Sequence, residues 1–188
     1  MHTTDSATNA FPVDTTATTT KTATPISVQT EDFDSAALVA GLRARTSGAA
    51  GAIVTFTGYV RDYSSETATR TLFLEHYPGM CERVLQSIVD EAHARWDVTQ
   101  ALVTHRVGEL EQGEQIVFVA IASAHRGDAF RACEFVIDAL KTRAPFWKRE
   151  TLADDTSFWV QARASDALQA QSWSHDSAAP PAVDKDAP

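Results

Sequence analysis

The stretch Asp138-Ala-Leu-Lys-Thr-Arg-Ala-Pro-Phe-Trp-Lys-Arg-Glu150 decides where a long helix ends and the next strand begins. Pro145 lies near its centre; it disfavours helical geometry in the residue before it and lacks the N–H that a helix interior requires. We therefore expect Lys141 to belong to the end of the helix and Lys148 to the following strand. The two side chains can then converge only through the turn.

The stretch also concentrates positive charge. The chain has four lysines, of which Lys21 and Lys185 lie in polar segments near its ends, and no acidic residue occurs between Lys141 and Arg149. One interpretation is an anion-binding site, and the other is a solvated basic helix end, which the helix dipole favours; the stretch alone leaves both open. In an anion site, the two arginines of the stretch and burial beside its Phe-Trp pair would lower the pKa of a lysine, which could then act as base, acid or nucleophile.

Composition restricts the class of protein. The chain has 188 residues, is 44% hydrophobic and carries a formal net charge of -9, which suits one domain and argues against a broad nucleic-acid-binding surface. Cys81 and Cys133 fall in apolar helical patterns without the spacing of zinc ligands, so we expect core thiols in a reduced, cytoplasmic protein, and neither metal nor cofactor. The longest apolar run, at 116–122, is too short to cross a bilayer, and the N-terminus lacks a secretory signal pattern.

Both ends of the chain have the composition of disordered tails. Residues 1–24 are rich in Thr and Ala, and residues 174–188 contain Pro180-Pro181 and scattered Asp. Such segments bury too little apolar surface to offset the entropy cost of ordering. We expect one folded domain over residues 25–173, without an internal linker or repeat.

Apolar periodicity predicts the elements of this domain. Strands are expected at 26–29, 52–60, 71–77, 101–107, 116–122, 146–151 and 158–162, and helices from Asp34 or Ser35 to near Gly48 and at 80–96, 128–142 and 166–173. The strand at 71–77 is expected to pair antiparallel with that at 52–60, and 109–115 to form a polar turn. Phe56, Met80 and Phe130 are expected in the core. Because strands and helices mix without a strict βαβ order, we predict an α+β fold with a mainly antiparallel sheet and two long helices.

His125 and Arg126 form a second candidate site, between a buried strand and the start of the next helix. Free backbone N–H groups at a helix N-terminus favour phosphate, and two cationic side chains would add to that preference. The alternative is an ordinary surface turn that Asp128 caps.

Arg61 is a third candidate because it ends a strand and precedes a polar loop at 62–69. A lone arginine is more often a solvated surface group. His76 and His105 lie within strand patterns and are interpreted as structural. No P-loop, dinucleotide-binding, zinc-protease or serine-hydrolase motif occurs, so the cationic residues favour a small phosphorylated anion and amine-assisted chemistry.

The sequence resembles the large, catalytic subunit of molybdopterin synthase. The resemblance covers roughly residues 26–173 and rests on several blocks in family order: AIVTFTGYVR (52–61), LEHYPGM (74–80), HRVGEL (105–110), SAHR (123–126), LKTRAPFWKRE (140–150) and WVQAR (159–163). The block around the two lysines is the most specific of them.

This resemblance implies an α/β-hammerhead-type fold and a homodimer at the core of a heterotetramer. A small ubiquitin-like sulfur-carrier subunit would dock at each end, as a separate chain. Its C-terminal Gly-Gly thiocarboxylate would donate sulfur to cyclic pyranopterin monophosphate, and two rounds would give the molybdopterin dithiolene for molybdenum cofactor biosynthesis.

The resemblance also assigns roles to single residues. Lys141 and Lys148 match the catalytic lysines of the family, and Arg61, His125 and Arg126 fall where the family binds the phosphate and pterin of the substrate. Arg163 matches a further basic position. The family pocket can draw on both subunits of the dimer. Two alternatives are a scaffold that docks the carrier without turnover, which has no need of the lysines, and an enzyme for another phosphorylated heterocycle.

Overall fold

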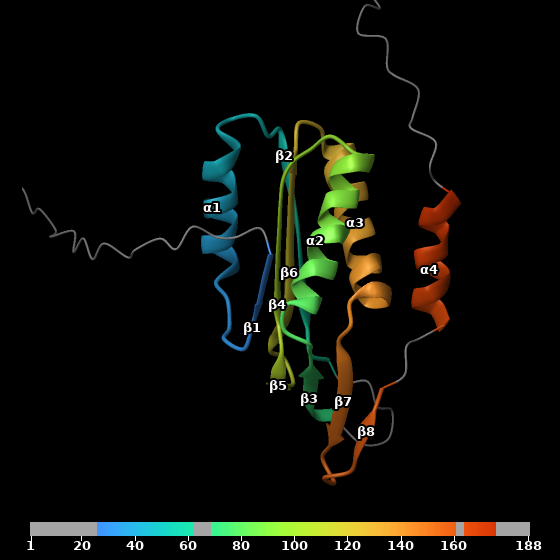
Figure 1. The fold of residues 1–188 in the computed structure, drawn as a ribbon. Coiled ribbons are helices and arrows are strands. Elements are labelled where there is room, and N and C mark those ends of the chain that lie inside the picture. The colour runs from blue at the N-terminus through green and yellow to red at the C-terminus, as the bar shows by residue number, and fades with distance from the viewer. Residues whose placement is uncertain (1–25, 62–68, 161–163, 176–188) are drawn as a thin grey trace, which may run out of the picture.

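The computed structural model describes residues 26–61, 69–160 and 164–175. Most of both predicted tails and nearly all of the predicted loop at 62–69 lie outside these ranges. Within them the chain forms two four-stranded sheets and four helices (Figure 1). None of the described helices is long and apolar enough to cross a membrane.

The first sheet has the strand order β1-β4-β6-β2 and forms the centre of the molecule. Its strands are β1 (Ile26–Gln29), β4 (Val98–Arg106), β6 (Gln115–Ser123) and β2 (Ala52–Tyr59). β1 runs parallel to β4, and the other pairs are antiparallel. Helix α1 (Ser35–Thr46) covers one face, and α2 (Met80–Arg95) and α3 (Arg126–Arg143) cover the other (Figure 1).

Both faces of β4 and β6 are buried, which explains their nearly continuous apolar sequences. Successive side chains of a strand point to opposite faces. Val103 and Val119 pack toward α2 and α3, whereas Leu102 and Phe118 pack with Leu42 of α1. Two separate hydrophobic cores therefore hold the first sheet between its helices.

Local signals set the helix ends as predicted. The Asp34 carboxylate caps α1 by accepting hydrogen bonds from the backbone N–H of Ala36 at 2.9 Å and of Ala37 at 3.0 Å. Helix α3 ends at Arg143, and Ala144, the residue before Pro145, is already extended. The chain then enters β7.

The second sheet has the order β5-β3-β7-β8 and is antiparallel throughout. It comprises β5 (Gly108–Glu111), β3 (Thr69–Glu75), β7 (Trp147–Leu152) and β8 (Ser157–Trp159). Its core contains Leu72, Leu74 and Leu110, and Phe146 packs against this core and against the α2–α3 core. Phe146 therefore joins the two halves of the molecule at the turn between α3 and β7.

The predicted fold class, the predominance of antiparallel strands and the two long helices, α2 and α3, are confirmed. The predicted pairing of 71–77 with 52–60 is wrong, because β2 and β3 belong to different sheets. Leu72 and Leu74 pack with Leu110 in a buried cluster, and β3 pairs with β5 and β7 instead. For the same reason, part of the predicted polar turn at 109–115 is strand β5.

Three residues expected in the core are exposed. Phe56 is 38% exposed, Met80 47% and Phe130 61%. Phe56 lies on β2, at the edge of the first sheet, and Phe130 lies beside the inward face that Ala129 and Cys133 define on α3. Helical spacing placed Phe130 near this face, but a shift of one residue turns a side chain by about 100°.

Candidate functional site

The turn between α3 and β7 holds the two predicted catalytic lysines, with both side chains exposed. The Phe146 N–H donates to the Ala144 carbonyl at 2.8 Å, which tightens the turn. The Cys81 thiol lies 3.7 Å from the Pro145 carbonyl and donates to it. Burial raises the pKa of this thiol, so it remains a protonated donor. Lys148 pairs with Leu74 in the second sheet, which fixes its backbone.

His105, on β4, lies directly against this turn. Its ring stacks on the Phe146 ring with centroids 4.0 Å apart and an interplanar angle of 17°. The ring is buried, and its Nδ1–H donates to the Arg106 carbonyl at 2.8 Å. Burial lowers the pKa of His105 to about 4; the hydrogen bond opposes this shift, and the charges of Lys148 and His76 add to it. The ring is therefore neutral at neutral pH.

Helix α4 (Ala164–His175) brings an acidic residue to Lys141. The Lys141 Nζ lies 3.9 Å from an Asp166 carboxylate oxygen. Trp173 anchors α4, since its Nε1–H donates to the Asp138 carboxylate at 2.9 Å and its ring meets those of Phe135 and Trp96 edge-on. Lys141 thus has a carboxylate partner that approaches from a different element.

The two arginines of the turn contact other groups. Arg143 donates to the Glu91 carboxylate at 2.7 Å, and Arg95 binds the same carboxylate. Burial disfavours the charge of Glu91, but the hydrogen bonds from both arginines outweigh it and hold the pKa of this carboxyl below its usual value. The Arg149 guanidinium lies over Phe73, 5.0 Å from the ring centroid. Arg143 therefore links α3 to α2, and Arg149 links β7 to β3.

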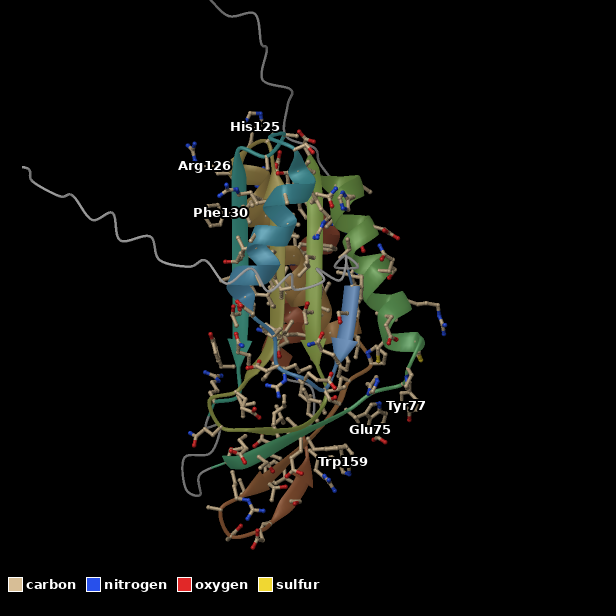
Figure 2. The ribbon with its side chains drawn as sticks, turned by 90° about the vertical axis from the view of Figure 1, so that its left-hand side faces the viewer. Glu75, Tyr77, His125, Arg126, Phe130 and Trp159 are labelled. Carbon is tan, nitrogen blue, oxygen red and sulfur yellow. The ribbon has the colours of Figure 1, made fainter. Side chains whose placement is uncertain are left out.

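His125 and Arg126 lie at the opposite end of α3, and both are exposed. His125 is the extended residue before the helix, and its side chain makes no capping hydrogen bond. With a rise of about 1.5 Å per residue, Arg126 and Lys141 lie roughly 22 Å apart along the axis of α3. Figure 2 shows His125 and Arg126 at one end of the molecule and Glu75, next to the Lys148 partner Leu74, at the other.

Arg61 lies at the lysine end. β2 begins at Ala52, paired with Ser123 close to His125, and ends at Tyr59, paired with Gln115. Arg61 follows that far end and is exposed. Arg163 lies outside the described residues. One protomer therefore groups Arg61, Lys141 and Lys148 at one end and separates them from His125 and Arg126.

An exposed aromatic surface adjoins the lysine end. It consists of Tyr77, Trp147 and Trp159. The rings of Trp147 and Trp159 meet edge-on at 6.4 Å. Exposed clusters of large aromatic side chains are characteristic of protein–protein contact surfaces.

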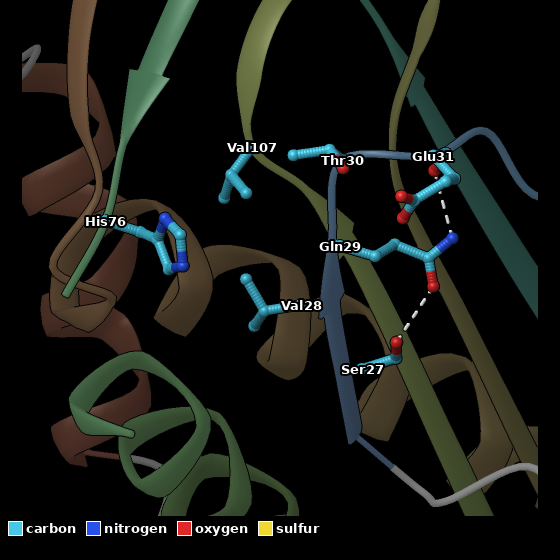
Figure 3. A pocket seen from close by; sticks show the side chains of 7 residues that line it. All are labelled: Ser27, Val28, Gln29, Thr30, Glu31, His76 and Val107. Carbon is cyan, nitrogen blue, oxygen red and sulfur yellow. Dashed lines mark hydrogen bonds between the residues drawn. The ribbon is translucent and has the colours of Figure 1, made fainter. Parts of the chain in front are cut away.

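An open pocket of about 590 Å³ borders the same end from the β1 side (Figure 3). Its lining includes consecutive residues 27–31, Val107 and His76. Val28 pairs with His105 across the sheet, so the pocket and the stacked ring lie on neighbouring strands. None of the described site residues predicted from the sequence lines this pocket, and among the described residues no cluster of His, Cys, Asp and Glu could hold a metal ion.

Sequence reasoning interpreted His105 as structural but did not predict its contact with the turn, and it missed Asp166 and Trp173. A histidine within the apolar strand 101–107 was a readable signal, because a buried polar side chain needs a specific partner. Nothing local in the sequence indicates that Asp166 meets Lys141, since that contact depends on how α4 docks.

Comparison with known proteins assigns the family. The model of the MoaE protein family matches residues 28–143. The molybdopterin synthase catalytic subunit of Ralstonia nicotianae is 50% identical over 148 residues, which cover 79% of this chain and 83% of the relative.

Solved structures agree with this comparison. The molybdopterin biosynthesis MoaE protein of Burkholderia ambifaria has a TM-score of 0.68 and 48% identity, covering 79% of this chain and 97% of that one. A protein–protein complex of subunits 1 and 2 of molybdopterin-converting factor from Helicobacter pylori has a TM-score of 0.62 at 18% identity, covering 74% and 92%, and shows the shared fold.

Proposed function

The chain belongs to the MoaE protein family, and we propose that it is the catalytic subunit of a molybdopterin synthase. In this role it transfers sulfur from the C-terminal thiocarboxylate of a small carrier subunit to cyclic pyranopterin monophosphate, which yields the molybdopterin dithiolene. The observation that carries the proposal is the turn between α3 and β7, which presents Lys141 and Lys148 on two differently anchored elements.

The two lysines divide the chemistry. Sulfur transfer needs a cation that steadies the thiocarboxylate and the developing negative charge, and a group that moves protons at the acceptor carbon. We assign Lys141, at the helix end, to the carrier's terminal carbonyl. Lys148, on the strand beyond Pro145, assists with protons or with the phosphate.

The N-terminus of α3 supplies the phosphate site. His125 and Arg126 are exposed, and the His125 side chain makes no capping hydrogen bond to the helix. The first N–H groups of the helix, the helix dipole and two cationic side chains all favour a dianion. This site lies too far from Lys141 to serve the same substrate within one protomer.

A second copy of the chain resolves this separation. Two protomers related by a two-fold axis across β2 run antiparallel, so the His125 end of one protomer meets the Lys141 end of the other. Each complete site would then combine Arg61, Lys141 and Lys148 of one protomer with the phosphate-binding residues of its partner. Arg163 would join one of these two sets.

The edge of β2 has the character of such an interface. β2 is an outer strand of the first sheet and carries no charged residue and no proline, the features that usually protect an exposed edge. Phe56 and Tyr59 are exposed on it, and in Figure 2 the exposed Phe130 projects beyond this edge from α3. Pairing of two β2 strands would cover these side chains and extend the sheet.

The carrier subunit is assigned to the aromatic surface of Tyr77, Trp147 and Trp159. This surface adjoins Lys148, so a docked carrier would need only a short extended tail to reach the lysines. Aromatic side chains supply most of the affinity in many protein interfaces. The Helicobacter pylori complex of two subunits supports a partner of this kind.

The test mixes the protein with a thiocarboxylated carrier and the pyranopterin precursor and measures dithiolene product per active site. Product should form in two sulfur additions, and a carrier without its last two glycines should give none. Carrier binding without product would support the scaffold alternative instead. Product formation with the truncated carrier would contradict insertion of the tail.

A further inference from the structure

We propose that His105 is a positioning residue whose stacked ring fixes the turn between Lys141 and Lys148, and with it the place of the Lys148 ammonium. The inference rests on the proposed function, in which Lys148 takes part in sulfur transfer. His105 itself touches neither carrier nor precursor in this proposal. It acts through Phe146.

The stack connects the turn to a central strand of the first sheet. His105 lies within β4, paired with Val28 of β1 on one side and with Val117 of β6 on the other. Phe146, in contrast, belongs to a short connection between a helix and a strand of the second sheet. A ring contact at 4.0 Å and 17° ties this connection to the centre of the first sheet.

The stack with His105 restrains the Phe146 side chain, together with the packing of that side chain against two cores. The Pro145 carbonyl accepts from the Cys81 thiol, and the Phe146 N–H donates to the Ala144 carbonyl, but both of these bonds restrain backbone atoms. The side chain of Phe146 packs between two cores, and Lys148 follows it after one residue. Displacement of the ring would therefore shift the start of β7.

The His105 ring must be uncharged to stay stacked on Phe146 beside a lysine. Lys148 and His76 both disfavour a proton on His105, and burial does so more strongly. The hydrogen bond from Nδ1–H to the Arg106 carbonyl satisfies the polar edge of the ring without adding charge. A neutral ring can thus stay against the turn while the Lys148 side chain extends toward solvent.

The first experiment compares His105→Phe, which keeps a stacking ring, with His105→Leu, which removes it. For His105→Leu we expect kcat for dithiolene formation to fall about tenfold with little change in the KM for the carrier, because the reacting group is misplaced while docking is intact. His105→Phe should restore kcat to within about threefold of the wild-type value, because ring stacking survives. Phe146→Leu should reproduce the loss, and the double variant His105→Leu/Phe146→Leu should lose no more than either single variant.

Leu42→Ala is the matched control. Leu42 is fully buried on the α1 side of the sheet, away from the turn, so its truncation lowers the melting temperature without moving Lys148. If His105→Leu lowers kcat no more than Leu42→Ala does at equal loss of stability, the positioning role is overturned. If His105→Leu does not fold, Phe146→Leu and His105→Phe decide the same question.

A second readout does not depend on turnover. Acetic anhydride labelling followed by peptide mass analysis gives the relative labelling rates of Lys148 and Lys141 in each variant. We expect His105→Leu to change the Lys148 rate about threefold or more with Lys141 nearly constant, and His105→Phe and Leu42→Ala to leave the ratio unchanged. An unchanged ratio in His105→Leu overturns the proposal. Absence of product from the wild-type protein would count against the proposed function, and the labelling ratio would still decide the role of His105.

Discussion

The two ends of α3 carry cations in different surroundings. At its C-terminal end, distant parts of the chain contact Lys141 and the turn after it: Asp166 on α4 pairs with Lys141, Cys81 on α2 bonds Pro145, and His105 on β4 stacks on Phe146. At its N-terminal end, His125 and Arg126 are exposed, and the His125 side chain makes no capping hydrogen bond. The lysine end is therefore held in place by the fold of a single protomer, whereas the cationic side chains at the His125 end lie on an open surface.

This difference agrees with a division of labour. Groups that act on reacting atoms gain from fixed positions, because misplacement of a reacting group is costly for the rate. Groups that bind a phosphate can lie on an open surface if a partner subunit covers that surface and completes the site. The four predictions below test the two ends separately and then together.

The largest effect is expected from Lys141. Lys141→Arg keeps the charge but replaces a compact ammonium by a planar group that stays protonated. We expect dithiolene formation per site to fall by about a hundredfold or more, because a general acid–base or charge-stabilising group is lost at the reacting carbonyl. Carrier binding, measured by titration in parallel, should be unchanged.

Arg131→Ala is the control for this substitution, since Arg131 is an exposed cation on α3 between the two ends. Its activity should stay near that of the wild type. Lys148→Arg should be impaired about tenfold, a smaller loss that is consistent with an assisting role. Near-normal product from Lys141→Arg would remove Lys141 from the chemistry and favour a basic helix end without a catalytic role.

The pH dependence of stability is the second test, and it probes the lysine end alone. The folded-state pKa of His105 is lowered from 6.5 to about 4, so between these values the unfolded chain binds a proton that the folded chain excludes. The free energy of unfolding must therefore fall as the pH falls through this window. From pH 7 to pH 5 this contribution is about 2 kcal/mol.

Urea denaturation at pH 7 and pH 5 measures this loss. His105→Phe should lose about 2 kcal/mol less than the wild type between the two pH values, because the other histidines are common to both proteins. Leu42→Ala, which removes no titratable group, should lose as much as the wild type. Identical losses for His105→Phe and the wild type would show that the ring at 105 is not held neutral.

The third prediction concerns the edge of β2. In an antiparallel pair of β2 strands around a two-fold axis, a residue near the middle of the strand faces its own copy. Thr55→Lys would place two like charges there and should weaken dimerisation about tenfold. Sedimentation equilibrium measures this change. Ser87→Lys, on the exposed side of α2, is the control and should leave the dimer intact.

Sequence reasoning identified the groups at both ends but not their separation. Short-range signals were reliable: Asp34 caps α1, and Pro145 ends α3. The lysines and the His125-Arg126 pair stand out because local sequence makes them unusual. Their separation follows from helix length, since fifteen residues of helix span roughly 22 Å.

Strand partners and helix docking could not be predicted in this way. β3 selects β5 and β7 through buried leucines that lie far apart in the sequence, and a neighbouring strand in sequence, β2, pairs elsewhere. Asp166 reaches Lys141 only because Trp173 docks α4 on α3. Such contacts are decided by the packing of the whole domain, so short-range periodicity does not contain them.

The fourth prediction joins the two ends by mixing subunits. Lys141→Ala and Arg126→Ala should each have low activity alone, the first through lost chemistry and the second through weakened precursor binding at subsaturating precursor. In a mixed dimer with shared sites, one site carries both substitutions and the other carries neither. Random pairing at equal amounts should then restore about a quarter of wild-type activity, because half of the dimers are mixed and half of their sites are intact.

Coexpression with two different affinity tags isolates the mixed dimer, which should show about half of wild-type activity because one of its two sites is intact. The control is a mixture of Lys141→Ala with Lys148→Ala, whose altered residues lie at the same end of one protomer. That mixture should restore nothing, because each site of its mixed dimer still lacks one lysine. If the mixture of Lys141→Ala with Arg126→Ala stays as inactive as this control, the His125 end does not complete the partner's site, and the substrate must be bound within a single protomer.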